Sequence, residues 1–163
     1  MRIPALFAFM ILAIAFRVDA ASHSDDRYVD YYYPAVTSEE TFSRVIANAP
    51  PSTAEIRTNF VTSITKAQLE APESPRFVIF EKGKESKNLI IVALDDEVFK
   101  TLFRARALLA QVTSNMRGTA FFRQQNLHVE GTLYDMLMIM QFEDLVITDG
   151  ETWAHKVTFE PKS

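Results

Sequence analysis

The side chains that could do chemistry in this sequence are few. Arg106 lies in a run whose apolar residues recur at helical spacing, and a rotation of about 100° per residue places it on the apolar side of that helix. An arginine keeps its proton, so on a core-facing side it needs a carboxylate, a set of carbonyls or an anionic ligand. Two interpretations follow: an ion pair with an acid on the sheet, such as Glu81 or Asp149, or a site for a small anionic ligand.

His155 is the second candidate, because it shares a strand face with apolar residues: Trp153, Val157 and Phe159. A lone histidine on such a face is usually hydrogen-bonded within the core and only occasionally a general base. Asp149 lies at a turn just before this strand. The ligand-binding candidates are therefore Arg106, His155, Asp149 and Trp153, and no residue is assigned a catalytic role.

Metal, cofactor and nucleotide sites are not expected. The chain has no cysteine, its three histidines lack ligand spacing, and its acidic clusters do not match a calcium-binding loop. The four glycines, Gly83, Gly118, Gly131 and Gly150, stand too far apart for a phosphate loop, a dinucleotide fingerprint or a nucleophile elbow. We therefore expect no cofactor and no metal.

The elements that must position these side chains follow from periodicity and turn residues. A capping box at 37–40 favours a helix over 38–48, and residues rich in Thr, Val and Ile favour a strand over 56–65. Further along we expect a hairpin (76–80 and 88–94), helices at 97–113, 119–126 and 132–142, and a second hairpin (145–148 and 152–159) around Asp149-Gly150. This order predicts an α+β fold with a mainly antiparallel sheet of about five strands, packed with three to four helices.

Three segments suggest contacts beyond a simple core. Neither strand of the first hairpin alternates apolar with polar residues, so both its faces must be covered by helices, by a second layer or by another subunit. A tyrosine-rich arm at 21–36, expected to be extended, either packs along its own domain or docks on another chain. The helix at 132–142 is apolar nearly all round, as in a core helix or a contact surface. The partner-binding candidates are Tyr31, Tyr32, Tyr33, Met138 and Phe142.

The N-terminus has the pattern of a signal peptide. Arg2 precedes an unbroken apolar run over 5–16, and small residues end the segment near Ala20. The run is too short for a membrane-spanning helix, so we expect cleavage near Ala20, a periplasmic location and no stable membrane span afterwards. The expected organisation is a signal peptide over 1–20, the arm over 21–36 and one α+β domain over 37–163.

Removing residues 1–20 leaves 15 basic and 20 acidic residues, a net charge of −5. Such a chain lacks the basic surface that nucleic acid requires. The leading hypothesis is therefore a non-enzymatic periplasmic binding or assembly-accessory module with a protein partner or a second copy of itself. The alternative is a small anionic-ligand-binding protein or enzyme centred on Arg106. Whether Arg106 faces a cavity or a carboxylate separates the two.

Five stretches carry a resemblance to a known family: YYYP (31–34), LIIVAL (89–94), LFRARALLA (102–110), FEDLVITDG (142–150) and AH (154–155). They resemble short exported proteins of marine and phototrophic alphaproteobacteria, over nearly all of the mature chain. Members are often labelled molybdopterin-guanine dinucleotide biosynthesis protein A, which implies a guanylyltransferase that uses GTP and magnesium. The glycine-rich phosphate loop of that activity has no counterpart here, since no two glycines lie within ten residues, so no catalytic residue carries over.

Overall fold

The computed structural model describes residues 28–45, 50–83, 85–94 and 101–162. They form, in order, β1 (Ser38–Val45), α1 (Ala54–Glu70), β2 (Phe77–Lys82), β3 (Asn88–Ala93), α2 (Leu102–Arg117), α3 (Ala120–Gln124), α4 (Leu133–Ile139), β4 (Asp144–Thr148) and β5 (Ala154–Lys162). The expected signal peptide, the first residues of the arm and the expected helix start at 97–100 lie outside the described residues. No helix in the described ranges is both long and apolar enough to cross a membrane.

The strands form one five-stranded sheet in the order β1-β5-β4-β3-β2. The hairpins β2–β3 and β4–β5 are antiparallel, whereas β1–β5 and β3–β4 pair in parallel. The sheet is therefore mixed, with two parallel pairs where mainly antiparallel pairing was expected. The parallel β3–β4 pair needs a long crossover, which α2, α3 and α4 supply. The α+β class and the five strands are confirmed.

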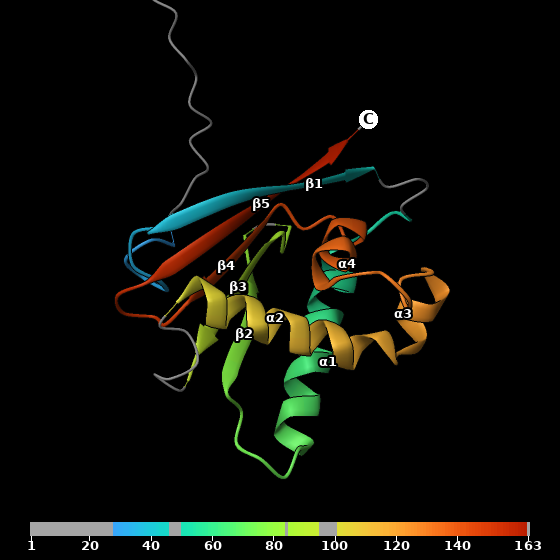
Figure 1. The fold of residues 1–163 in the computed structure, drawn as a ribbon, viewed down its shortest axis with the longest axis horizontal. Helices are drawn as coiled ribbons and strands as arrows, with labels where there is room; N and C mark the ends of the chain where they lie inside the picture. Colours follow the sequence, from blue (N-terminus) through green and yellow to red (C-terminus); the bar gives the residue numbers. More distant parts are fainter. Residues whose placement is uncertain (1–27, 46–49, 84, 95–100, 163) are drawn as a thin grey trace, which may run out of the picture.

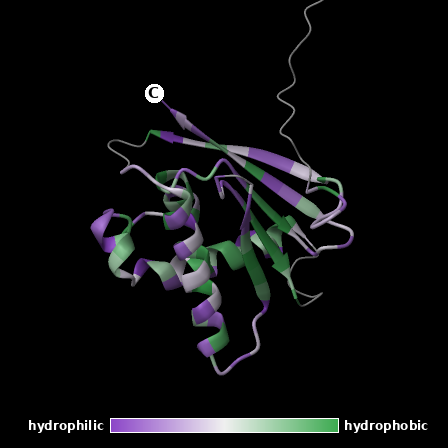
Figure 2. Cartoon of the chain, turned by 180° about the vertical axis from the view of Figure 1, so that it is seen from behind, coloured by the Kyte–Doolittle hydropathy of each residue, from purple (hydrophilic) through white to green (hydrophobic). Residues whose placement is uncertain are grey.

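All four helices lie on one face of the sheet (Figure 1). The main core fills the space between them and draws on every helix, with Phe60, Leu109, Phe122 and Leu137 against sheet residues such as Ile91 and Ile147. Figure 2 shows the β2–β3 hairpin coloured hydrophobic along most of its length. Such strands need cover on their second face as well.

The second face is covered by the tyrosine segment. Tyr33 is only 4% exposed and packs in a smaller cluster with Ile90 of β3, Val146 of β4 and Ala154 of β5. The segment is not extended over residues 28–33: the Asp30 N–H donates to the Tyr33 carbonyl at 2.7 Å, which closes a tight turn. The prediction that both faces of the hairpin are covered is confirmed, by helices on one side and by the chain's own arm on the other.

The predicted helix at 38–48 is wrong over its described part, because residues 38–45 form the edge strand β1. Its first five side chains alternate between a partly buried set and an exposed set, Ser38, Glu40 and Phe42 against Glu39 and Thr41. Four of these five residues are polar, so the period of two left no hydrophobic signal. The Thr37 hydroxyl, expected to cap a helix, donates instead to the Ala154 carbonyl of β5 at 2.8 Å.

The predicted strand at 56–65 is also wrong, since these residues lie within α1. The Thr53 side chain caps this helix by accepting from the Ile56 N–H at 3.3 Å. Arg57, Phe60 and Val61 fall on one buried side at helical spacing. Helix propensities differ by no more than about 0.7 kcal/mol per ordinary residue, so packing of this side outweighs the preference of Thr, Val and Ile for strands.

The remaining predicted elements are confirmed within a few residues. The two hairpins are β2–β3 and β4–β5, and the three later helices correspond to α2, α3 and α4. Asp149 and Gly150 lie in the second turn, where Gly150 takes a φ of 82° that favours glycine. A capping box is present in the chain, but at α4, where Thr132 and Asp135 cap each other's backbone N–H groups.

Candidate functional site

A groove runs along α1 on the helical side of the molecule, with a cavity volume of about 740 Å³. α1 forms one wall, α2 and the start of α3 form the other, and the loop from α1 to β2 closes one end. The floor consists of four buried apolar side chains, Phe60, Leu108, Met136 and Met140. Small-ligand sites typically have volumes of about 300–1,000 Å³ and apolar linings, so this groove has the dimensions of a binding site.

Polar groups line the rim of the groove. The side-chain amides of Asn59, Gln111 and Asn115 line it, and none of them hydrogen-bonds another protein group in the part of the chain that the structure describes. Gln68 differs, because its Nε2 donates to the Phe77 carbonyl at 3.1 Å and so ties α1 to the start of β2. The three amides of the rim are therefore available to a ligand.

Two charged residues line the groove, Glu73 and Arg76, both in the loop that follows α1. Both are exposed. Among the described residues, neither makes an ion pair with another side chain. The loop end of the groove therefore carries a guanidinium that no carboxylate among the described residues neutralises by direct contact.

Sequence reasoning missed this groove because it assigned a strand to the residues of its main wall. The signal was present: Ile56, Phe60, Ile64 and Ala67 are spaced by four, four and three residues, which is the spacing of one helix face. All four line the groove. The two methionines of the floor belong to the predicted helix at 132–142, whose apolar surface is thus used partly as core and partly as groove.

Three of the four predicted ligand-binding residues meet elsewhere, around Glu40 of β1. The Arg106 guanidinium pairs with Glu40 Oε2 at 2.5 Å, and the Tyr134 hydroxyl donates to Oε1 at 3.1 Å. His155 Nε2 lies 3.5 Å from the same Oε1. Trp153 stacks on the His155 ring with an interplanar angle of 12°. The sequence did not single out Glu40, because it placed this residue in a helix cap.

The charges around Glu40 favour its ionised form. Partial burial alone would raise the pKa of this carboxyl, but the hydrogen bonds from Arg106 and Tyr134 and the charge of Arg106 lower it below its ordinary value of 4.5. Burial and the Glu40 charge raise the pKa of the Tyr134 phenol. At neutral pH this cluster therefore consists of a carboxylate, a guanidinium and a neutral phenol.

Arg106 itself is not on the core-facing side of α2. Its side chain is 56% exposed, and the buried stripe runs instead through Ala105, Leu108 and Leu109. Arg106 sits at the edge of this stripe, where it can reach the carboxylate on β1. The guanidinium thus faces a carboxylate, Glu40 rather than the suggested Glu81 or Asp149, and it does not line the groove.

His155 is buried, at 1% exposure, and its Nδ1 lies 2.9 Å from Ser38 Oγ. The order Ser38, His155, Glu40 matches that of a nucleophile, a base and an orienting acid. The imidazole, however, is enclosed and covered by Trp153, which leaves no room beside it for a substrate. The contacts of His155 join β5 to the edge strand β1, and this is a packing role.

Asp149 acts in the turn between β4 and β5. Its carboxylate accepts backbone N–H groups of Glu151, Thr152 and Trp153, each at 2.9 Å. Although partial burial would raise the pKa of Asp149, the Thr152 hydroxyl and these backbone groups lower it to about 2. All of these acceptor contacts are local, so Asp149 serves the turn and lies apart from the Glu40 cluster.

The predicted partner-binding residues divide by exposure. Tyr33, Met138 and Phe142 are buried in the chain's own cores at 3–5% exposure, so they offer no surface to a partner. Tyr31 is 78% exposed, and Tyr32 is half-buried against Phe80 with ring centroids 5.5 Å apart. The three residues are buried because the arm packs on the apolar second face of the sheet and α4 packs on the first face.

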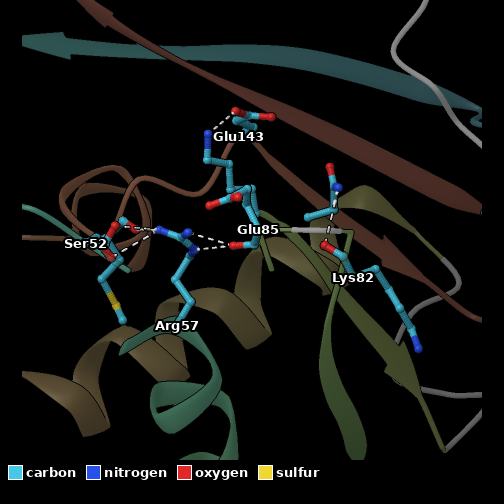
Figure 3. A network of polar contacts seen from close by, with 8 residues as sticks. Ser52, Arg57, Lys82, Glu85 and Glu143 are labelled. Atoms are coloured by element: carbon cyan, nitrogen blue, oxygen red, sulfur yellow. Dashed lines mark hydrogen bonds and ion pairs between the residues drawn. The ribbon is translucent and has the colours of Figure 1, made fainter. Parts of the chain in front are cut away.

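The buried arginine that the sequence analysis sought is Arg57, at the start of α1. It is 1% exposed and donates to three carbonyls: Glu85 at 2.6 and 3.0 Å, Met140 at 3.0 Å and Ser52 at 3.4 Å. Figure 3 shows its guanidinium between Ser52 and the β2–β3 turn at Glu85. No carboxylate pairs with it among the residues described. The chemistry expected for Arg106, charge satisfied by a set of carbonyls, therefore occurs at Arg57.

Within the described ranges, no group of three or more His, Asp or Glu side chains is arranged to hold a metal ion. Comparison of the chain with protein-family models, with curated proteins and with solved structures gave no match. The resemblance drawn from the sequence therefore stays a prediction.

Proposed function

We propose that this chain is a non-enzymatic binding protein that holds the apolar body of a small ligand in the groove along α1. One observation carries the proposal: a groove of about 740 Å³ combines a floor of buried apolar side chains with three amides on its rim that hydrogen-bond no other described residue. Apolar pockets with a few polar groups are the usual form of a ligand site. The Glu40 cluster supports a non-enzymatic function indirectly, since its polar side chains contact one another and join elements of the fold.

The proposal also places the protein outside the cytoplasmic membrane, because residues 1–20 have the pattern of a cleaved signal peptide. In the periplasm the ligand would meet a groove whose walls come from three helices of one chain. A contact with a protein partner or a second copy remains part of the proposal at Tyr31, which is exposed on the opposite side of the sheet.

The test uses a neutral apolar dye, N-phenyl-1-naphthylamine, whose emission rises in an apolar site. The mature chain is expected to bind it saturably. Ala67→Trp should weaken binding several-fold, because Ala67 is an exposed residue of α1 that lines the groove and a large ring there occupies part of it. Thr62→Trp is the matched control, since Thr62 is exposed on the same helix but does not line the groove.

Thermal unfolding of each variant within about 2 °C of the parent shows that the fold is intact. The proposal fails if the dye does not bind saturably. It fails equally if a folded Ala67→Trp variant binds the dye as tightly as the Thr62→Trp variant does.

A further inference from the structure

The groove is long. Its lining includes Ile56 near the start of α1 and Ala71 just after its end. At about 1.5 Å per helical residue these positions lie about 22 Å apart. A groove of this length fits a linear chain better than a compact ring system.

The two ends of the groove differ in charge. The α1 start contributes Ile56, which is 43% exposed, and no charged residue lines that end among the residues described. The other end has Arg76 on the loop before β2, with a guanidinium that no described carboxylate pairs with. A ligand that fills the groove therefore places its apolar body along α1 and one terminus near a positive charge.

We infer that the ligand is a single-chain amphiphile with an anionic head, a long-chain carboxylate, whose head group lies at Arg76 and whose alkyl chain follows α1. The inference rests on the proposed function and names its ligand class. Glu73 lies in the same loop and also lines the groove. Its negative charge repels an anionic head group, so its removal should strengthen binding, whereas removal of the Arg76 charge should weaken it. Both charges act on the head, and neither touches the alkyl chain.

The alkyl part sets the first expected magnitude. Burial of one methylene is worth about 0.8 kcal/mol, or about a fourfold change in affinity. Octanoate, decanoate and dodecanoate should therefore differ by roughly 14-fold per two carbons, measured by displacement of N-phenyl-1-naphthylamine at low salt. The carboxylate sets the second: an exposed ion pair changes affinity by about two- to fivefold, so dodecanoate should bind more tightly than dodecanol by that factor.

Two variants report on the head group. Arg76→Gln should weaken dodecanoate about two- to fivefold and leave dodecanol unchanged, whereas Glu73→Gln should strengthen dodecanoate. Lys66→Gln is the matched control, because Lys66 is an exposed cation of α1 that does not line the groove. The ligand class is refuted if dodecanoate and dodecanol bind the parent equally, or if Arg76→Gln and Lys66→Gln have the same effect.

The same chemistry has a second source, the acyl chain of a membrane phospholipid. A groove that holds one alkyl chain predicts no co-sedimentation with phosphatidylglycerol vesicles, and vesicle binding as tight as dodecanoate binding would overturn the single-chain assignment. Binding and displacement of the dye distinguish failure of the ligand class from failure of the proposed function. If the dye binds and no alkyl ligand displaces it, the ligand class is wrong and the groove remains a binding site; if the dye does not bind, the proposed function itself fails.

Discussion

Arg57 provides the sharpest test of how this fold is held together, through the substitution Arg57→Met. Methionine retains an apolar stem in the same space but removes the guanidinium, so the carbonyls of Glu85, Met140 and Ser52 lose their donor. These three carbonyls belong to three separate segments: the β2–β3 turn, the end of α4 and the entry to α1. The variant should therefore loosen the meeting point of these segments.

The magnitude follows from two opposing effects. Hydrogen bonds from a charged donor contribute about 1.5–3 kcal/mol each, and the bonds to Glu85 and Met140 are short, at 2.6–3.0 Å. Against this, methionine avoids the cost of burying a guanidinium, which is several kcal/mol. Because the acceptors stay behind without donors, we expect a net loss of about 3 kcal/mol in the free energy of unfolding.

Urea unfolding of the chain measures this loss, and a fall in Tm of roughly 10 °C should accompany it. Arg57→Lys keeps the charge but has one ammonium group, which cannot reach the Glu85 and Met140 carbonyls together, so it should also lose stability. Lys66→Met is the control, since Lys66 is 72% exposed on the same helix. The reasoning is refuted if Arg57→Met unfolds within about 0.5 kcal/mol of the parent and of this control.

Three further predictions concern the polar cluster and two turns. Glu40→Gln should lower the free energy of unfolding by about 1–2 kcal/mol at pH 7 relative to Glu39→Gln. Because the folded state lowers the pKa of Glu40, its contribution to stability is present above the ordinary pKa of 4.5 and is lost as the pH falls below it. The denaturant midpoints of parent and variant should therefore converge in acid. Asp149→Ala should cost about 1–2 kcal/mol at neutral pH and remove the part of acid unfolding between pH 3.8 and about 2, as followed by circular dichroism. Gly131→Ala should destabilise the chain by more than 1 kcal/mol in thermal unfolding, since a Cβ at this position would overlap the Cβ and the carbonyl oxygen of Leu127.

Much of the fold was accessible from sequence where pattern and turn chemistry agree. The apolar runs of β2 and β3, separated by a charged turn with Gly83, and the Asp149-Gly150 turn between β4 and β5 predicted both hairpins. The first two elements were exchanged, because β1 is an edge strand whose outward and inward residues are nearly all polar. α1, in turn, carries β-branched residues, and the packing of its buried side outweighs their preference for strands.

The candidate site was less accessible for a related reason. A groove between helices depends on how far apart the helices lie, and no local pattern encodes that distance. The chemistry of a buried arginine was anticipated correctly, yet periodicity pointed to Arg106 when the enclosed residue is Arg57. The error is one position along the helix, a rotation of about 100°: Ala105, next to Arg106, is completely buried. A difference of one position along α2 decides whether an arginine there forms a surface ion pair or is buried.

β1 and its neighbour β5 lie far apart in the sequence, so the order in which the strands are synthesised differs from the order in which they pair. Of the described strands, β1 is synthesised first and its neighbour in the sheet, β5, is synthesised last, and Ser38 contacts His155 across 117 positions. Contacts of such long sequence separation form late in folding. Until β5 arrives, β4 also lacks a partner on that side, with its buried Leu145 and Ile147 beside a bare edge. β1 and β4 therefore gain the neighbour that they share only after residues Ala154–Lys162 have been synthesised.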